Sequence, residues 1–122
     1  MTRFLYDTDP RSAFILRGYA GTGKTSLISA LIATLPQLRV NSLLLAPTGR
    51  AAKVLSGYSH QPAYTIHKKI YMTATDASGA IRTVRAINKH SYTLFIVDEA
   101  SMIGLEPTST GQSLLEDLID YV

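Results

Sequence analysis

The chain has 122 residues, 46% of them hydrophobic, and a formal net charge of +3, which corresponds to one soluble domain or part of one. It contains no cysteine, which excludes disulfides and thiolate metal sites and is typical of a reducing cytoplasm. The N-terminus does not resemble a signal peptide, and no apolar run approaches the roughly 18 residues of a membrane span, so we expect a cytoplasmic protein with no membrane contact.

The first half of the chain alternates between strand and helix patterns. Residues 14–16 form a short apolar run that predicts a buried strand, and apolar residues recur at helical spacing over 24–35 until Pro36. Residues 42–46, SLLLA, predict a second strand of the continuous apolar kind found in parallel sheets. A helix over 48–55 is predicted to follow it.

The second half adds a different pattern. A short helix is predicted over 65–70, with Thr65 as its N-cap. Residues 71–85 predict a β-hairpin, residues 93–97 a third buried strand, and residues 112–122 a helix. This order predicts an α/β fold, a three-layer sandwich with a parallel sheet and a small inserted hairpin, whose ligand binds at the carboxyl ends of the strands.

A glycine-rich loop separates the first strand from the first helix. Residues 18–25, GYAGTGKT, match the phosphate-loop pattern G-x-x-x-x-G-K-[ST] in the strand-to-helix context that this pattern requires. We expect its backbone N–H groups to bind phosphates, Lys24 to reach the outer phosphates and Thr25 to hold Mg²⁺. The alternatives are a glycine-rich turn that binds nothing and a G-x-G-x-x-G dinucleotide loop, which lacks its third glycine here. The predicted nucleotide-binding residues of the loop are Gly21, Thr22, Gly23, Lys24, Thr25 and Ser26.

Two acids follow the third predicted strand. In IVDEAS, we expect Asp98 to bind Mg²⁺ and Glu99 to polarise the water that attacks the γ-phosphate, although an acidic strand end at the surface would have the same sequence. A P-loop kinase needs no catalytic acid directly after its aspartate. Glu99 therefore favours ATP hydrolysis, with Lys24 and Glu99 as the catalytic residues.

Charge is distributed unevenly along the chain. Residues 39–90 contain one acid, Asp76, whereas residues 91–122 contain six acids and no Lys or Arg. The basic segment is interpreted either as a solvated face or as a surface that binds a phosphate backbone. Its cations are Arg39, Arg50, Lys53, Lys68, Lys69, Arg82, Arg85 and Lys89.

Four motifs in this order resemble the first motor domain of superfamily-one DNA helicases, in particular the RecD-like group that includes the phage Dda helicase. They are GYAGTGKTS, LLLAPTGRAAKVLS, YTIHKKI and IVDEASMI. The resemblance implies a RecA-like fold, ATP and Mg²⁺ as cofactors, and 5′→3′ movement on single-stranded DNA or at a forked duplex. By the same resemblance, the residues on the DNA side are Pro47, Thr48, Gly49, Arg50, Thr65 and His67.

The predicted hairpin lies where relatives insert a pin at the duplex fork. Tyr71, Arg82 and Arg85 are candidates to contact the strand, and a purely structural hairpin is the alternative. For His67, taken alone, a surface or core histidine is the alternative.

The resemblance covers only part of one motor domain. Relatives continue into a strand that ends in Gly-Asp-x-x-Gln and a second RecA-like domain, and no glutamine precedes Gly18 to match their adenine-reading motif. The absent strand would lie between the third strand and the P-loop strand, so we expect marginal stability and no unwinding by this stretch alone. Two other functions stay open: a non-hydrolysing ATP- or DNA-binding remnant and a P-loop small-molecule kinase.

Overall fold

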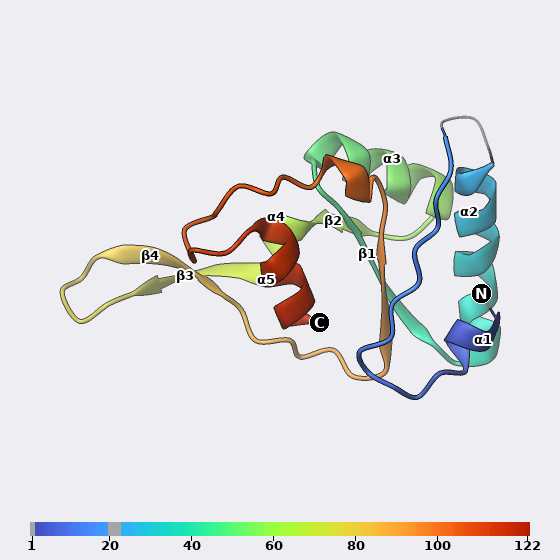
Figure 1. Cartoon of the computed structure of the whole chain (residues 1–122), viewed down its shortest axis with the longest axis horizontal. Coiled ribbons are helices and arrows are strands. Elements are labelled where there is room, and N and C mark those ends of the chain that lie inside the picture. The colour runs from blue at the N-terminus through green and yellow to red at the C-terminus, as the bar shows by residue number, and fades with distance from the viewer. Residues whose placement is uncertain (1, 20–22) are drawn as a thin grey trace.

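The computed structural model describes residues 2–19 and 23–122. The longest described helices, α2 and α3, have 11 residues each, and no helix in these two ranges is long and apolar enough to cross a bilayer. The elements in chain order (Figure 1) are α1 Thr2–Leu5, α2 Lys24–Thr34, the 3₁₀ helix η1 Leu35–Leu38, β1 Asn41–Ala46, α3 Gly49–Ser59, β2 Ala63–Thr65, α4 Ile66–Ile70, β3 Tyr71–Thr75, β4 Ile81–Arg85, β5 Thr93–Val97, the 3₁₀ helix η2 Ala100–Met102 and α5 Leu114–Tyr121.

The main sheet is parallel, as the continuous apolar strands predicted. Its order is β2-β1-β5, with β1 in the centre. Leu44 of β1 is in register with Ala63 of β2 and with Ile96 of β5. The pairing with β5 continues one residue beyond the strand, where the N–H of Asp98 donates to the Leu45 carbonyl at 3.0 Å.

Helices cover both faces of this sheet because the buried side chains of β1 alternate between them. Leu43 and Leu45 belong to one apolar cluster, and Leu44 belongs to the other, so β1 is part of both cores. The molecule thus has two helical layers around a parallel sheet. The first cluster is completed by Ile66, Ile70, Leu114, Leu118 and Tyr121 of α4 and α5, and the second by Ile32, Leu35, Leu55 and Ile96 of α2, η1, α3 and β5.

The predicted strand over residues 14–16 is wrong. These residues have no regular secondary structure, and the side chains of Phe14 and Ile15 are 45% and 79% exposed. Phe14 packs on the ring of Phe4, with 5.9 Å between the ring centroids. A strand needs a neighbour for its backbone groups, and no described residue after Val97 adds a strand to the parallel sheet that could pair with this segment.

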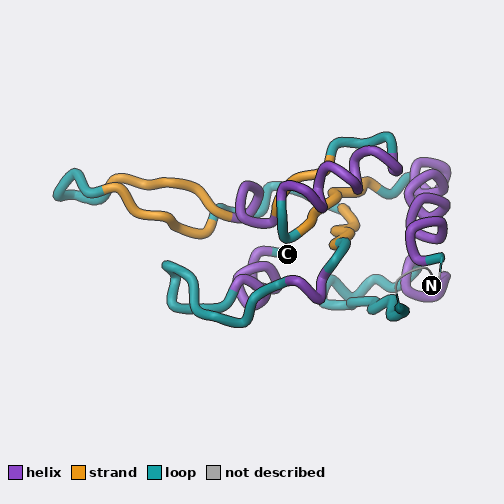
Figure 2. The backbone as a smooth tube through the Cα atoms, turned by 90° about the horizontal axis from the view of Figure 1, so that it is seen from above, coloured by secondary structure: helices purple, strands orange, loops and turns teal. Residues whose placement is uncertain are grey.

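The predicted hairpin is confirmed. β3 and β4 pair antiparallel from Tyr71↔Arg85 to Thr75↔Ile81, and the ribbon projects from the body of the molecule (Figure 2). Its turn is closed by Asp76, whose Oδ1 accepts from the backbone N–H of Ser78 at 2.9 Å and of Ala80 at 3.0 Å. At the base, the Ala86 N–H donates to the Ile70 carbonyl at 2.7 Å.

The other predicted elements form with shifted bounds. α2 gives way to η1 around Pro36, and α3 continues to Ser59, four residues beyond its predicted end at Leu55. α5 begins after Ser113, which accepts from the Glu116 N–H in a capping box. The three-residue strand β2 was not predicted.

Candidate functional site

The start of α2 provides the described part of the phosphate loop. Gly23 precedes the helix with a φ of 87°, a left-handed conformation that glycine adopts without strain, and no side chain caps the N-terminus. The Nζ of Lys24 donates to the carbonyls of Gly18 and, at 2.9 Å, Tyr19. The lysine side chain therefore reaches back to residues 18 and 19. The predicted residues Gly21 and Thr22 lie outside the described residues.

Thr25 and Ser26 occupy the first turn of α2 and are exposed. Neither hydroxyl hydrogen-bonds to another residue in the described part of the chain, and the first N–H groups of a helix have no acceptor within it. This turn consequently combines unused donors, a lysine and a hydroxyl that can bind a metal, which is the donor set that a triphosphate with Mg²⁺ requires.

The predicted acid pair lies at the carboxyl end of β5. The Oδ2 of Asp98 accepts from the hydroxyl of Tyr58 at 2.8 Å, and Oδ1 accepts from the N–H of Glu99 at 3.0 Å. Burial and the neighbouring Asp98 raise the pKa of the Tyr58 phenol, which therefore remains a donor at neutral pH. Glu99 is exposed and has a φ of 54°, a conformation uncommon for a residue with a side chain.

The two halves of the predicted site lie at one end of the sheet. Figure 1 shows α2 beginning, and the orange strand β5 ending, at the upper end of the molecule. In parallel α/β sheets this end is where ligands bind. No group of three or more His, Asp and Glu side chains that could hold a metal occurs within residues 2–19 and 23–122. Mg²⁺ at nucleotide sites needs only one or two protein oxygens besides the phosphates, so Thr25 with Asp98 fits this mode of binding.

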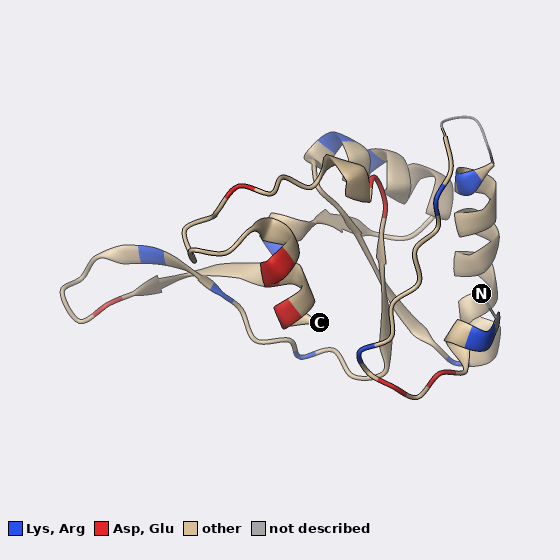
Figure 3. Cartoon of the chain, viewed as in Figure 1, with Lys and Arg blue, Asp and Glu red and all other residues tan. Residues whose placement is uncertain are grey.

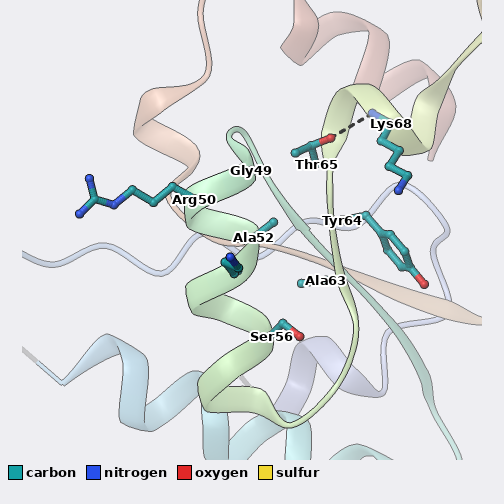
Figure 4. Close-up of a pocket in the computed structure, with 9 residues that line it drawn as sticks. Gly49, Arg50, Ala52, Ser56, Ala63, Tyr64, Thr65 and Lys68 are labelled. Atoms are coloured by element: carbon teal, nitrogen blue, oxygen red, sulfur yellow. Dashed lines mark hydrogen bonds between the residues drawn. The ribbon is translucent and has the colours of Figure 1, made fainter.

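A second candidate site is a groove of about 670 Å³ between α3 and the β2–α4 segment (Figure 4). Arg50 and Lys53 belong to its α3 wall and Lys68 to the opposite wall, and no acid lines it. The groove lining thus combines three basic residues with hydroxyl groups, a composition that suits a chain of phosphates. Of the three, Arg50 points its side chain away from the β2–α4 wall (Figure 4). Its lining consists of Gly49, Arg50, Ala52, Lys53, Ser56, Ala63, Tyr64, Thr65 and Lys68.

The structure brings some of the predicted DNA-side residues together in this groove, namely Gly49, Arg50 and Thr65. Thr48 is the N-cap of α3 and accepts from the Ala51 N–H at 3.1 Å, while Thr65 is the N-cap of α4 and accepts from the Lys68 N–H at 3.2 Å.

The remaining predicted DNA-side residues do not line the groove. Pro47 precedes the Thr48 cap and is partly exposed. His67 packs on the ring of Tyr71, with 5.6 Å between the centroids.

The hairpin residues considered for a pin make contacts within the protein. Arg85 pairs with Asp117 at 3.5 Å and with Asp120 at 3.2 Å, the Tyr71 hydroxyl donates to Asp117, and Arg82 pairs with Asp76 at 3.0 Å. In Figure 3, acids lie on α5, beside the base of the hairpin. Tyr71 and Arg85 therefore serve the hairpin's attachment to α5, which agrees with the structural alternative.

Asp117 is the centre of this attachment. Its side chain is fully buried and accepts hydrogen bonds from the hydroxyls of Tyr71, of Thr108 at 3.1 Å and of Thr110 at 2.6 Å. It also forms the ion pair with the Arg85 guanidinium. Burial alone would raise the pKa of Asp117, but these donors outweigh burial and hold the pKa below its usual value.

Sequence reasoning missed Tyr58 and Ser56, and it named Lys53 and Lys68 only among the cations of the basic segment. The signal for the groove is the spacing of Arg50, Lys53 and Ser56, three residues apart on one helical face of α3. No sequence pattern connects Tyr58 with Asp98.

A protein-family model described as an AAA domain matches residues 6–119, which is most of the chain. The match includes the phosphate loop, the groove and the acid pair.

Proposed function

Because the chain belongs to the AAA domain family, we propose that it forms the ATP-binding part of an ATP-dependent DNA helicase. Domains of this family are P-loop ATPase domains and generally bind ATP with Mg²⁺. The observation that carries the proposal is the position of the α2 start and the β5 end at one end of a parallel sheet. An isolated glycine-rich turn would not require an acid pair there.

In this proposal, Lys24 and the free N–H groups of the first turn of α2 bind the outer phosphates. Thr25 and Asp98 hold Mg²⁺, which when bound neutralises charge on the phosphate oxygens. Glu99, one residue beyond Asp98 and exposed, polarises the attacking water. The resemblance of the sequence motifs extends the proposal to a second motor domain and 5′→3′ movement.

The groove on α3 supports nucleic acid as the partner. Three basic residues without an acid match a polymer with one charge per nucleotide better than a single phosphate acceptor. This observation favours a DNA motor over a small-molecule kinase. We propose single-stranded DNA, alone or at a fork, as the ligand.

Nucleotide binding is tested with a fluorescent ATP analogue and the Lys24→Ala variant. Loss of the lysine should abolish binding, whereas the exposed Lys89→Ala variant should bind like the wild type. Undiminished binding by Lys24→Ala would refute the assignment of the phosphate loop.

The class of activity is tested by phosphate release from ATP with and without single-stranded DNA, using the chain together with whatever domains accompany it. Stimulation by DNA is the expected result. Binding without turnover would support the non-hydrolysing remnant, and phosphate transfer to a small acceptor would support the kinase.

The groove is tested by the salt dependence of DNA binding. Lys53→Ala and Lys68→Ala should each weaken binding regardless of sequence and lower the slope of log K against log salt by about 1. Lys89→Ala, outside the groove lining, is the control. An unchanged slope in both groove variants would contradict the placement of DNA there.

A further inference from the structure

Tyr58 connects α3 to the end of β5. Its hydroxyl donates to Oδ2 of Asp98 at 2.8 Å, across 40 positions of the sequence. The ring is partly buried and packs against the apolar cluster that contains Leu44, Leu55 and Ile96. Since the core fixes the ring, it also fixes the position from which the hydroxyl donates.

Asp98 is held at three points by three different parts of the chain. Its N–H donates to the Leu45 carbonyl of β1 at 3.0 Å, its Oδ1 accepts from the Glu99 N–H at 3.0 Å, and its Oδ2 accepts from Tyr58. The first two contacts are local or belong to the sheet. Tyr58 is the one side chain that donates to this carboxylate among the described residues.

A carboxylate oxygen that accepts one hydrogen bond still has a lone pair for a cation. A hydrogen-bond donor to a metal-binding carboxylate fixes the orientation of that carboxylate. Loss of such a donor typically lowers the metal affinity by about 10–100-fold. A rotatable aspartate would otherwise have to lose side-chain freedom when the metal binds.

We propose that Tyr58 is a positioning residue that holds the Asp98 carboxylate in the orientation in which it binds the Mg²⁺ of the nucleotide. This inference rests on the proposed ATP site. It assigns to α3, whose residues from Gly49 to Ser56 contribute to the groove, a second role close to its C-terminal end. Tyr58 itself contacts neither phosphate nor metal.

The experiment measures the affinity for a fluorescent ADP analogue in EDTA and in Mg²⁺, and takes the ratio of the two dissociation constants as the gain from the metal. Tyr58→Phe removes only the hydroxyl. Tyr121→Phe is the matched control, because Tyr121 is a buried tyrosine that packs on Phe95 of β5, with 6.1 Å between the ring centroids.

We expect Tyr58→Phe to keep the affinity measured in EDTA and to lose about 10-fold or more of the gain from Mg²⁺. Tyr121→Phe should keep both. In Asp98→Asn, which removes the ligand, the additional Tyr58→Phe change should have no further effect on the gain.

The outcomes separate this inference from the proposed function. A wild-type protein that binds no nucleotide refutes the ATP site and the inference with it. If Mg²⁺ clearly raises the affinity of the wild type, and raises that of Tyr58→Phe by an equal or larger factor, only the positioning role is refuted. A larger gain would mean that the phenol competes with the metal for Oδ2.

Discussion

Asp117→Asn is expected to destabilise the fold because it changes the charge of a fully buried acceptor but keeps its shape. Oδ2 of Asp117 accepts from Tyr71, Thr108 and Thr110, and Oδ1 faces the Arg85 guanidinium. An amide that keeps its oxygen toward the three hydroxyls turns its NH₂ group toward Arg85.

The size of the effect follows from these contacts. Each of the three hydroxyl groups would donate to a neutral amide oxygen instead of a charged carboxylate, which weakens each hydrogen bond by about 1 kcal/mol. The free energy of unfolding should therefore fall by about 3 kcal/mol. Urea denaturation at neutral pH measures this difference. Asp120→Asn is the control: its carboxylate, about half exposed, pairs with the same arginine, and we expect a loss below about 1 kcal/mol.

The stability difference between the wild type and Asp117→Asn should also depend on pH. The pKa of Asp117 is lower in the folded state than its ordinary value of 3.8, so its stabilisation is present above that value and disappears as the pH falls through the folded-state pKa. The difference between wild type and Asp117→Asn should therefore shrink in acid. A difference below about 1 kcal/mol at neutral pH, or one that is constant into acid, would refute the reasoning.

Three further predictions concern stability. Thr48→Ala removes the N-cap of α3 and should lower the unfolding free energy by about 1 kcal/mol, whereas a change in the urea midpoint smaller than experimental error would mean that solvent replaces the cap. Leu45 is fully buried in the centre of β1, so Leu45→Ala should lower the free energy of unfolding by about 2–5 kcal/mol in urea denaturation. The side chain of Ile15 is 79% exposed, so Ile15→Ala should lower it far less, and an equal loss would place residue 15 in the core. Gly79→Ala at a φ of 83° should cost about 1 kcal/mol and Gly104→Ala almost nothing, as thermal unfolding would show; equal melting temperatures would contradict the strained turn.

The sequence predicted the elements whose signal is local. The runs at β1 and β5 are apolar because both faces of these strands are covered, and the hairpin is recognisable from the turn at Asp76. Residues 14–16 carry the same apolar signal, but a strand also depends on a partner, which local sequence does not describe. β2 has three half-buried residues, too few for a periodic pattern.

The candidate site was predicted in part for the same reason. Lys24, Thr25, Asp98 and Glu99 belong to short contiguous motifs, so their positions at the α2 start and the β5 end follow from the order of the elements. The hydroxyl of Tyr58 donates to Asp98 through a tertiary contact between α3 and the end of β5, and only the folded arrangement reveals this contact.

The position of β1 has a consequence for how the molecule unfolds. One strand supplies Leu43 and Leu45 to one apolar cluster and Leu44 to the other. Unfolding of either helical layer would expose one face of β1, the strand against which the remaining layer also packs. The two layers should consequently unfold together, as one cooperative unit. Unfolding of α5 should therefore also destabilise α2 on the far side of the sheet.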